Sequence, residues 1–267
     1  VVYRGRQPTF EREVAVKVLL VSGLDARQGE RFNRELAAMG KLSWHPNIVT
    51  VYSAGLTGDR EPYIVMEFLP GGSLGARLKA TGPMPPQQAL EIGVRLASAL
   101  ETAHRAHILH RDVKPENVLL SRLGEPKLTD FGIAQVEGLH STRTGVTHMS
   151  IAHAPPELIN AGTSNAATDI YALGSTLATL LLGHAPYVER DSDQLGTVIG
   201  RIVGGPVPDL AALGIAPAVA APLSSALAKS PDARPASAFA FAEQLTEAQR
   251  AMGFPQTKIL VEPAELQ

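Results

Sequence analysis

Two short runs of the sequence contain side chains whose types and spacing could do chemistry. Residues 110–117 read HRDVKPEN, and residues 130–132 read DFG. Together they supply three carboxylates, an amide and a lysine. Phosphoryl transfer needs little covalent help from a protein, so the useful groups position an acceptor hydroxyl and neutralise charge on the phosphates. The triplet HRD alone would mean little, but the whole octet followed by DFG is not a pattern that chance produces.

The two runs resemble the catalytic loop and the metal-binding motif of the eukaryotic-like, or Hanks-type, protein kinases. The resemblance implies that Asp112 orients the acceptor hydroxyl and accepts its proton, while Lys114 neutralises the γ-phosphate of ATP. Asn117 and Asp130 are expected to hold Mg²⁺, with Mn²⁺ as the alternative metal. A lysine two residues after the base suits a short hydroxyl, so the expected acceptors are Ser and Thr of proteins.

Upstream residues extend the resemblance. Residues 14–17 look like the strand whose lysine, Lys17, grips the α- and β-phosphates, and Glu35 lies in a helical pattern where the family has an ion-pairing glutamate. Each match has a plain alternative, because a strand lysine is usually solvated and Glu35 would ordinarily be a surface charge. Their order ahead of the catalytic loop favours the catalytic interpretation, and residues 45–49, HPNIV, support the register of Glu35.

The segment MEFL at residues 66–69 resembles the connector against which adenine forms hydrogen bonds. The candidates are the carbonyl of Glu67 and the main-chain N–H and carbonyl of Leu69. An apolar slot is the usual character of a cofactor pocket. The side chains expected to form it are Val2 and Ala15 on one side and Leu119 on the other. The alternative for these three residues is ordinary sheet core.

Further matches concern support and regulation. Glu157, in the APPE run, is expected to pair with Arg234, and Asp169 is expected to brace the backbone of the catalytic loop. Arg111 lies beside the expected catalytic base and would attract a phosphate on the activation segment, residues 133–154. The hydroxyls of this segment include three candidates for autophosphorylation: Thr142, Thr144 and Thr147.

The secondary structure expected to position these residues changes from strands to helices along the chain. Strand-like runs occur at residues 14–19 and 62–68, and residues 31–42 have helical spacing between them. Beyond a Gly/Pro connector after Leu69, long helical patterns occupy residues 85–107 and 169–182. We therefore expect an α+β, two-lobed protein kinase-like fold with three parts: a β-rich N-lobe at 1–69, a helical C-lobe at 70–250, and the start of a linker at 251–267.

The two ends suggest a piece of a longer chain. The first residue is Val1, and the chain starts at the VVY that would follow the last glycine of the family's phosphate-covering loop. That glycine loop is therefore expected upstream of Val1, and no signal peptide is expected in the segment.

Composition excludes several classes of function. The 24 basic and 26 acidic residues give a formal net charge of −2, so no global field draws the chain to nucleic acid. Cysteine is absent, which excludes disulfides, thiolate metal sites and thiol nucleophiles. No apolar run reaches the roughly 18 residues of a membrane span. The expected location of this kinase domain is the cytoplasm.

Two other classes of protein compete with a protein kinase. A pseudokinase, or docking module, would lose Lys17, Asp112 or Asp130, and all three are present. A small-molecule kinase of the aminoglycoside phosphotransferase type lacks the activation segment and its supporting arginine. Among protein kinases, the sequence resembles the actinobacterial group of regulatory Ser/Thr kinases. Met149, His153 and Pro155 depart from the commoner Gly, Tyr and Ala, which affects substrate specificity and not the reaction class.

Overall fold

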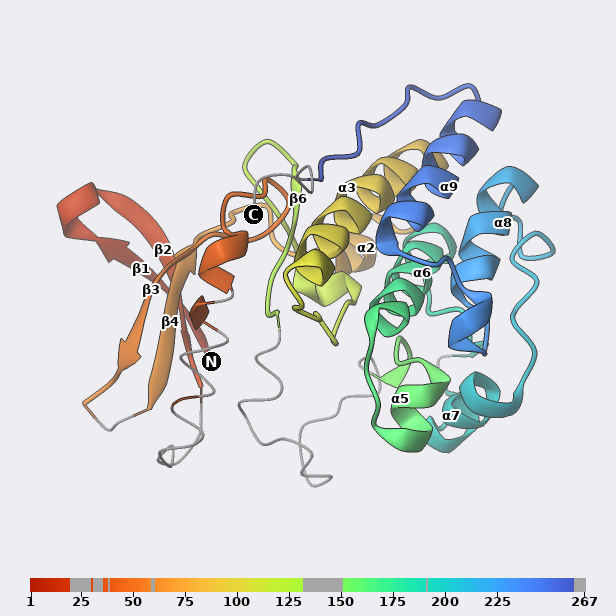
Figure 1. The fold of residues 1–267 in the computed structure, drawn as a ribbon, viewed down its shortest axis with the longest axis horizontal. Helices are drawn as coiled ribbons and strands as arrows, with labels where there is room; N and C mark the ends of the chain where they lie inside the picture. The colour runs from red at the N-terminus through yellow and green to blue at the C-terminus, as the bar shows by residue number, and fades with distance from the viewer. Residues whose placement is uncertain are drawn as a thin grey trace.

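The computed structural model describes residues 1–19, 30, 36–37, 39–58, 61–131, 151–190 and 192–261. Within these ranges an antiparallel sheet and a larger helical body lie side by side (Figure 1). This arrangement confirms the expected α+β, two-lobed kinase fold. Among the helices of the described ranges, none is long and apolar enough to cross a membrane.

The sheet of the smaller body has four strands in the order β1-β2-β4-β3, all antiparallel. Its central strand β4 alternates buried and half-buried residues, because successive side chains of a strand point to opposite faces. The strands are β1 (Val2–Gln7), β2 (Arg12–Val18), β3 (Val51–Leu56) and β4 (Pro62–Glu67). The strand-like runs at 14–19 and 62–68 therefore correspond to β2 and β4.

The larger body is built from helices around α6. This helix is apolar on nearly all sides and is buried from Thr168 to Leu180. It begins at Ala166, three residues earlier than its apolar pattern, because Asn165 and Thr168 form a reciprocal capping box. The helices are α2 (Leu74–Thr81), α3 (Pro86–Arg105), α5 (Pro156–Ala161), α6 (Ala166–Leu182), α7 (Leu195–Gly204), α8 (Pro217–Ala226) and α9 (Ala238–Ala251).

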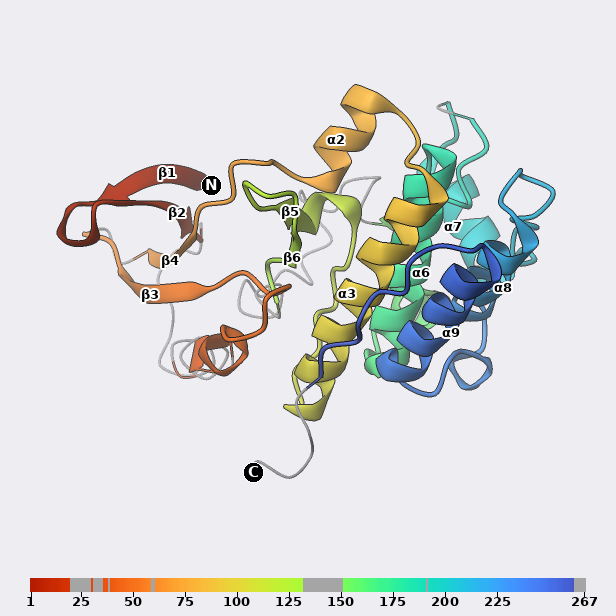
Figure 2. The same cartoon turned by 90° about the horizontal axis from the view of Figure 1, so that it is seen from above.

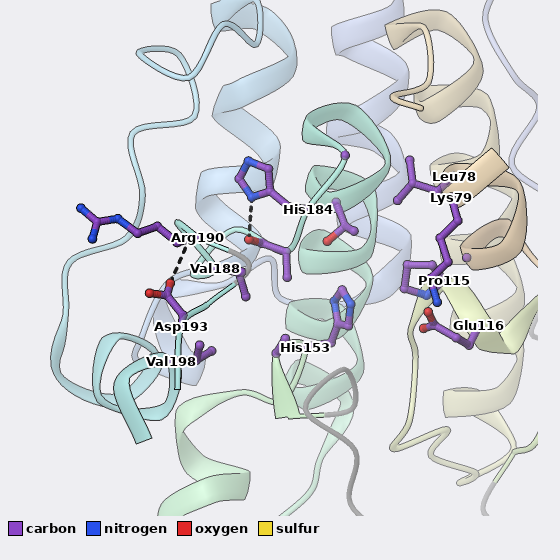
Figure 3. A pocket seen from close by; sticks show the side chains of 15 residues that line it. Leu78, Lys79, Pro115, Glu116, His153, His184, Val188, Arg190, Asp193 and Val198 are labelled. Atoms are coloured by element: carbon purple, nitrogen blue, oxygen red, sulfur yellow. Dashed lines mark hydrogen bonds between the residues drawn. The ribbon is translucent and has the colours of Figure 1, made fainter. Parts of the chain in front are cut away.

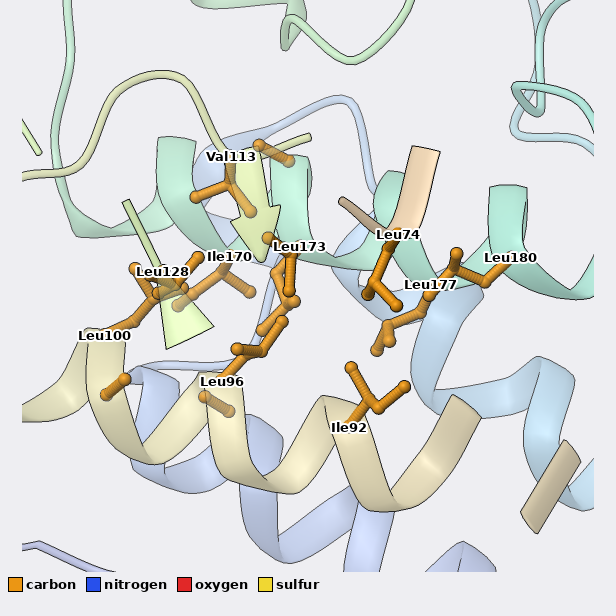
Figure 4. Close-up of a cluster of buried hydrophobic side chains, with 14 of the residues drawn as sticks. Leu74, Ile92, Leu96, Leu100, Val113, Leu128, Ile170, Leu173, Leu177 and Leu180 are labelled. Carbon is orange, nitrogen blue, oxygen red and sulfur yellow. The ribbon is translucent and has the colours of Figure 1, made fainter. Parts of the chain in front are cut away.

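The core of the larger body forms where α3 and α6 face each other. Figure 4 shows Leu96 and Leu100 of α3 directed at Ile170, Leu173 and Leu177 of α6. All five side chains are at most 1% exposed. Full burial of such a side chain is worth about 1.5–3 kcal/mol, so this contact fixes the helix that carries Asp169.

A two-stranded ribbon, β5 (Val118–Leu120) and β6 (Pro126–Leu128), joins the two bodies. Leu128 exchanges backbone hydrogen bonds with Asn47 and Val49, and Leu120 does so with Gly71 and Gly72. The short 3-10 helix Pro115–Asn117 leads into β5. The catalytic loop and the DFG run therefore flank a ribbon that is bonded to both bodies.

Residues 252–261 follow α9 without forming a helix or strand. They leave the end of α9, cross α3 and approach the segment that precedes β3 (Figures 1 and 2). Met252, Phe254 and Ile259 are partly buried and pack against the core.

Candidate active site

Asp169 fixes the backbone of the catalytic loop, as the sequence predicted. Its Oδ2 accepts the N–H of His110 at 2.9 Å and its Oδ1 accepts the N–H of Arg111 at 2.7 Å. Arg111 has a φ of 69°, in the left-handed region that costs a side-chain-bearing residue energy. The buried carboxylate therefore holds a strained turn just before Asp112.

His104 supports that carboxylate, and the sequence analysis did not single it out. Its Nε2 lies 2.8 Å from Asp169 Oδ2. Burial pushes the pKa of Asp169 upward, but hydrogen bonds from His104 and from the loop amides outweigh it, so the pKa lies below its ordinary value. Because the carboxylate is ionised and only accepts, Nε2 is the donor. His104 is far from Asp169 in the sequence, and only packing of α3 against α6 brings them together.

The loop places Asp112 among polar partners. Lys114 Nζ lies 2.7 Å from Asp112 Oδ2, and Asn117 Nδ2 donates to both the main-chain carbonyl and Oδ2 of Asp112 at 2.8 Å. About a third of the Asp112 side chain stays exposed. Lys114 Nζ also donates to Oδ1 of Asp112 at 3.0 Å, so both carboxylate oxygens are held in place by neighbouring side chains.

Lys17 of β2 reaches across to the DFG run. Its Nζ lies 2.9 Å from Asp130 Oδ1, and both side chains are mostly buried. Asp130 has a φ of 68°, and the adjacent Phe131 packs its ring on His110 with centroids 4.4 Å apart. Burial lowers the pKa of His110, which keeps its ring neutral in this stack.

The oxygens of Asn117 and Asp130 suit a hard divalent cation. Asn117 spends its Nδ2 on Asp112, which leaves its Oδ1 as an oxygen ligand, and Asp130 keeps one oxygen beyond its bond to Lys17. Thr129 N–H donates to the carbonyl of Asn117 at 3.0 Å, so the two candidate ligands stand at the same end of the β5–β6 ribbon. Within the described residues, no cluster of three or more His, Cys, Asp or Glu side chains could hold a metal ion. Mg²⁺ ordinarily binds through one or two protein ligands and completes its coordination shell with water and phosphate.

The candidate adenine residues gather at the cleft side of the sheet. Val2 pairs with Lys17 across the β1–β2 ladder, and Ala15 lies two residues from Lys17, so all three side chains share one face. Leu119 is the half-buried middle residue of β5, between two buried neighbours. Neither the N–H nor the carbonyl of Leu69 has a main-chain partner in the part of the chain that the structure describes.

The side chains of Glu67 and Met66 in the connector contact the β5–β6 ribbon and the residue that follows it. Glu67 Oε2 accepts Lys127 Nζ of β6 at 2.7 Å. Nearby, Thr129 Oγ1 contacts the sulfur of Met66 at 3.8 Å. Both contacts tie the connector to the ribbon, and neither Lys127 nor Thr129 belongs to a motif that the sequence analysis used.

The predicted pair of Glu157 and Arg234 is confirmed. Two parallel hydrogen bonds of 2.7 and 2.8 Å join them, and the Arg234 side chain is completely buried. Arg234 also donates to the carbonyls of Ala167, Ala228 and Lys229. Burial raises the pKa of Glu157, but the bonds from Arg234 more than offset this effect and the net shift is downward.

A cavity of about 520 Å³ opens beside the catalytic loop. Figure 3 shows Glu116 and Lys79 on one side of it and His184, Arg190 and Asp193 on the other. The cavity begins at Pro115 and Glu116, directly after Lys114. It is therefore a groove next to the candidate base, and Lys17 is not among the residues that line it.

Several predicted residues lie outside the described ranges. These are Glu35, Gly132 and the activation-segment positions Ser141, Thr142, Thr144, Thr147, Met149 and Ser150.

The fold and this cluster are those of protein kinases, and sequence comparison agrees. Residues 1–235 match the protein kinase domain family. The chain belongs to that family.

Relatives of this chain include bacterial proteins that bear the name serine/threonine-protein kinase. PknK of Mycobacterium tuberculosis is 46% identical over 253 residues, which is 95% of this chain and 23% of that protein. PknL of the same species is 33% identical over 267 residues, covering 97% of this chain and 64% of PknL. PrkC of Bacillus subtilis is 38% identical over 188 residues, or 70% of this chain and 29% of PrkC. The resemblance to Hanks-type bacterial kinases is thus confirmed, and the chain spans about a quarter of PknK.

Proposed function

We propose that this chain is the catalytic domain of an active Ser/Thr protein kinase, which transfers the γ-phosphate of Mg-ATP to Ser and Thr hydroxyls. The supporting observation is one arrangement: Asp112, held by Lys114 and Asn117, stands near the pair of Lys17 and Asp130. A cation, two oxygen ligands and an oriented carboxylate are the groups that this reaction requires.

Each residue has a role in this mechanism. Asp112 orients the acceptor hydroxyl and takes its proton as the new O–P bond forms and the bond from the γ-phosphorus to the bridging oxygen of ATP breaks, with ADP as the leaving group. Lys114 is close enough to neutralise the transferred phosphoryl group. Lys17 turns from Asp130 to the α- and β-phosphates, and Glu35 is the proposed partner of Lys17. Mg²⁺ or Mn²⁺, held by Asn117 and Asp130, would supply neutralisation of phosphate charge.

The nucleotide base would lie between the sheet and the ribbon. Val2 and Ala15 would cover one face and Leu119 the other, while Leu69 offers an N–H and a carbonyl that bond to no main-chain group of the described residues. The carbonyl of Glu67 is the remaining candidate acceptor. We take residues 1–69 as the N-lobe, 70–250 as the C-lobe and 251–267 as the start of a linker, because the connector after Leu69 separates the sheet from α2.

The acceptor would approach along the groove of Figure 3. It borders Pro115 and Glu116, so a peptide lying in it presents a side chain to Asp112. A neutral His153 forms part of the wall, since burial lowers its pKa to about 3. Proteins carrying Ser and Thr are the proposed substrates, with the cytoplasm as the compartment and no role for nucleic acid or membrane in this segment.

The protein itself is a further proposed substrate. Arg111 lies beside Asp112, and a phosphate carries a charge of roughly −1.5 to −2 that an arginine can bind while a loop becomes ordered. Thr142, Thr144 and Thr147 are the proposed positions of autophosphorylation.

The test compares the wild-type protein with Asp112→Asn, using labelled ATP, a generic basic protein and a panel of amino sugars. We expect label on protein only, a loss of transfer of about 10³-fold or more in Asp112→Asn, and ATP affinity within a few-fold of wild type. Mass spectrometry of both proteins after incubation with Mg-ATP shows whether Thr142, Thr144 and Thr147 carry phosphate.

Two results would contradict the proposal. Transfer by Asp112→Asn within about threefold of wild type removes the role of the carboxylate, and label on the sugars supports a small-molecule kinase. ATP binding without any transfer by the wild-type protein favours the pseudokinase alternative, which the retention of Lys17, Asp112 and Asp130 argues against.

A further inference from the structure

The residues after α9 are bonded to both bodies of the molecule. We call residues 254–261 the C-terminal strap. Within it, Leu260 uses both of its main-chain groups: its N–H donates to Ser98 Oγ of α3 at 3.2 Å, and its carbonyl lies 3.0 Å from His45 Nε2. His45 precedes β3, on the side of the sheet, whereas Ser98 lies in the centre of the helical body. One residue of the strap therefore spans the junction.

The hydrogen bonds of His45 fix its tautomer. Its Nδ1 lies 3.1 Å from the N–H of Asn47, which can only donate, so Nδ1 accepts. The ring proton is therefore on Nε2 and points to the carbonyl of Leu260. Both bonds are made by the neutral ring, and His45 is 1% exposed.

The strap is fixed along its length and not only at Leu260. Gln249 of α9 donates from Nε2 to Thr257 Oγ1 at 2.8 Å, and its Oε1 accepts the N–H of Thr257 at 2.9 Å. Phe254 and Ile259 pack against the core. Figures 1 and 2 show the strap lying over α9 and α3 before it reaches the segment at residues 43–50.

The other end of the contact leads to the nucleotide cleft. His45 and Asn47 belong to the turn at residues 45–49, which is bonded to β6 through Leu128 and through Asn47 Nδ2 to the carbonyl of Pro126 at 2.8 Å. The turn directly follows helical residues 39–42 of the sheet body, whose Met39 and Leu42 are buried in the core. A restraint on the turn is therefore a restraint on that helix and on the angle between the two bodies.

We propose that the C-terminal strap is a clasp that holds the turn at 45–49 to α3 and α9, and that it thereby sets the affinity of the cleft for ATP. His45, Ser98 and Leu260 are positioning residues in this device, since none of them touches the nucleotide. The ATP part rests on the proposed function, whereas the clasp itself can be observed without nucleotide.

The chain provides its own reporter for the clasp. Trp44 is the single tryptophan of the sequence and is 51% exposed, and its ring meets that of His45 edge to face at 5.5 Å. In variants that keep His45, release of Leu260 frees this pair, so quenching of tryptophan fluorescence by acrylamide reports the strap in Leu260→Pro and its control.

Two substitutions of His45 separate the clasp from the local turn. His45→Asn keeps an oxygen near the place of Nδ1 for the N–H of Asn47 but cannot reach Leu260. His45→Gln places a donor near the position of Nε2 and loses the bond to Asn47. If the clasp matters, His45→Asn behaves as a released strap, whereas His45→Gln stays close to wild type except at the amide of Asn47, which loses its acceptor.

Leu260→Pro tests the other bond of the strap, because proline lacks the N–H that Leu260 donates to Ser98 Oγ. Lys258→Pro, at an exposed position two residues earlier, is its control. Melting temperatures of all four variants identify any that fail to fold. If Leu260→Pro fails to fold, the comparison of His45→Asn with His45→Gln still tests the clasp.

The expected result combines three measurements. In His45→Asn and Leu260→Pro, amides 45–49 exchange hydrogen about tenfold faster and the Kd for Mg-ATP rises about 3–10-fold, as loss of one or two hydrogen bonds predicts. In Leu260→Pro, which keeps the ring of His45, Trp44 is also quenched more strongly than in Lys258→Pro.

Unchanged hydrogen exchange in both variants would overturn the clasp. So would a His45→Gln variant that matches His45→Asn in its Kd for Mg-ATP and in the exchange of the amides other than that of Asn47. Faster exchange with an unchanged Kd in a wild type that binds ATP would overturn its link to the nucleotide. A wild-type protein that binds no ATP contradicts the proposed function instead, and the exchange data then still decide whether the strap is a clasp.

Discussion

At the scale of single residues, the candidate active site contains two pairs of oppositely charged side chains at short distance. Lys17 and Asp130 pair at 2.9 Å, and Lys114 and Asp112 pair at 2.7 Å. Neither pair is fully buried, so each can open when an anionic substrate enters. Lys17 belongs to strand β2 of the sheet, whereas Asp112 and Lys114 belong to the catalytic loop and Asp130 follows β6.

Replacing Lys17 by methionine removes the cation and keeps the length of the side chain. We expect kcat/KM to fall about 10²–10³-fold, the size of effect seen when one preorganised charge donor is removed from a reacting site. The control is Arg6→Met, which removes an exposed cation from the neighbouring strand β1. Equal kinetics for the two variants in steady-state assays would show that Lys17 is only a surface charge.

At the scale of elements, α6 organises the large body because it contacts the catalytic loop at one end and other helices along its length. Asp169 in its first turn holds the loop, and Thr176 Oγ1 donates to the carbonyl of Val113 at 3.5 Å. Farther along, Gly174 lets α8 approach closely. A Cβ built there would come within 2.7 Å of Ala226 Cβ.

Gly174→Ala therefore tests the packing of α6 on α8. Helix propensity alone favours alanine by about 1 kcal/mol, but the clash forces the helices apart, and we expect a net loss of about 1–3 kcal/mol in the free energy of unfolding.

Gly196→Ala in α7 is the matched control, since nothing lies within 4 Å of the added methyl. It should stabilise the protein by about 0.4–1 kcal/mol. Chemical denaturation measures both changes, and the same sign for the two variants would contradict the packing argument.

At the scale of the whole molecule, buried histidines couple folding to pH. His45, His110 and His153 all have pKa values below the ordinary value, in each case chiefly because burial disfavours the charged ring. The unfolded chain binds protons to these rings near pH 6.5 and the folded chain does not. Acid therefore favours unfolding.

His153 gives the clearest window, because its pKa is lowered to about 3. Its contribution to stability is complete above pH 6.5 and is lost progressively as the pH falls toward 3. We expect His153→Asn to reduce the slope of unfolding free energy against pH, between pH 6 and 4, by about 1.4 kcal/mol per pH unit.

His184→Asn, at an exposed histidine, is the control and should leave the slope unchanged. Urea denaturation at several pH values measures the slopes. A parallel shift of the whole curve in His153→Asn would mean that the ring takes up its proton in the folded state.

The sequence by itself determined the reaction class and the order of the elements. Residues 110–117 and 130–132 are local motifs, and β2, β4, α3 and α6 follow from patterns whose period is local as well. Local signals of this kind can be recognised in the sequence without knowledge of the fold. They also predicted the pair of Glu157 and Arg234, but only through resemblance to a family.

Only the tertiary structure decided which distant residues meet. His104 reaches Asp169 because α3 packs on α6, Lys127 reaches Glu67 because the ribbon lies against the connector, and Leu260 reaches His45 because the strap crosses α3. A hydrogen bond between residues far apart in the chain leaves no periodic trace in the sequence, since its geometry is set by the packing of whole elements. The close approach at Gly174 is of the same kind, because it depends on the facing helix α8 and not on α6 alone.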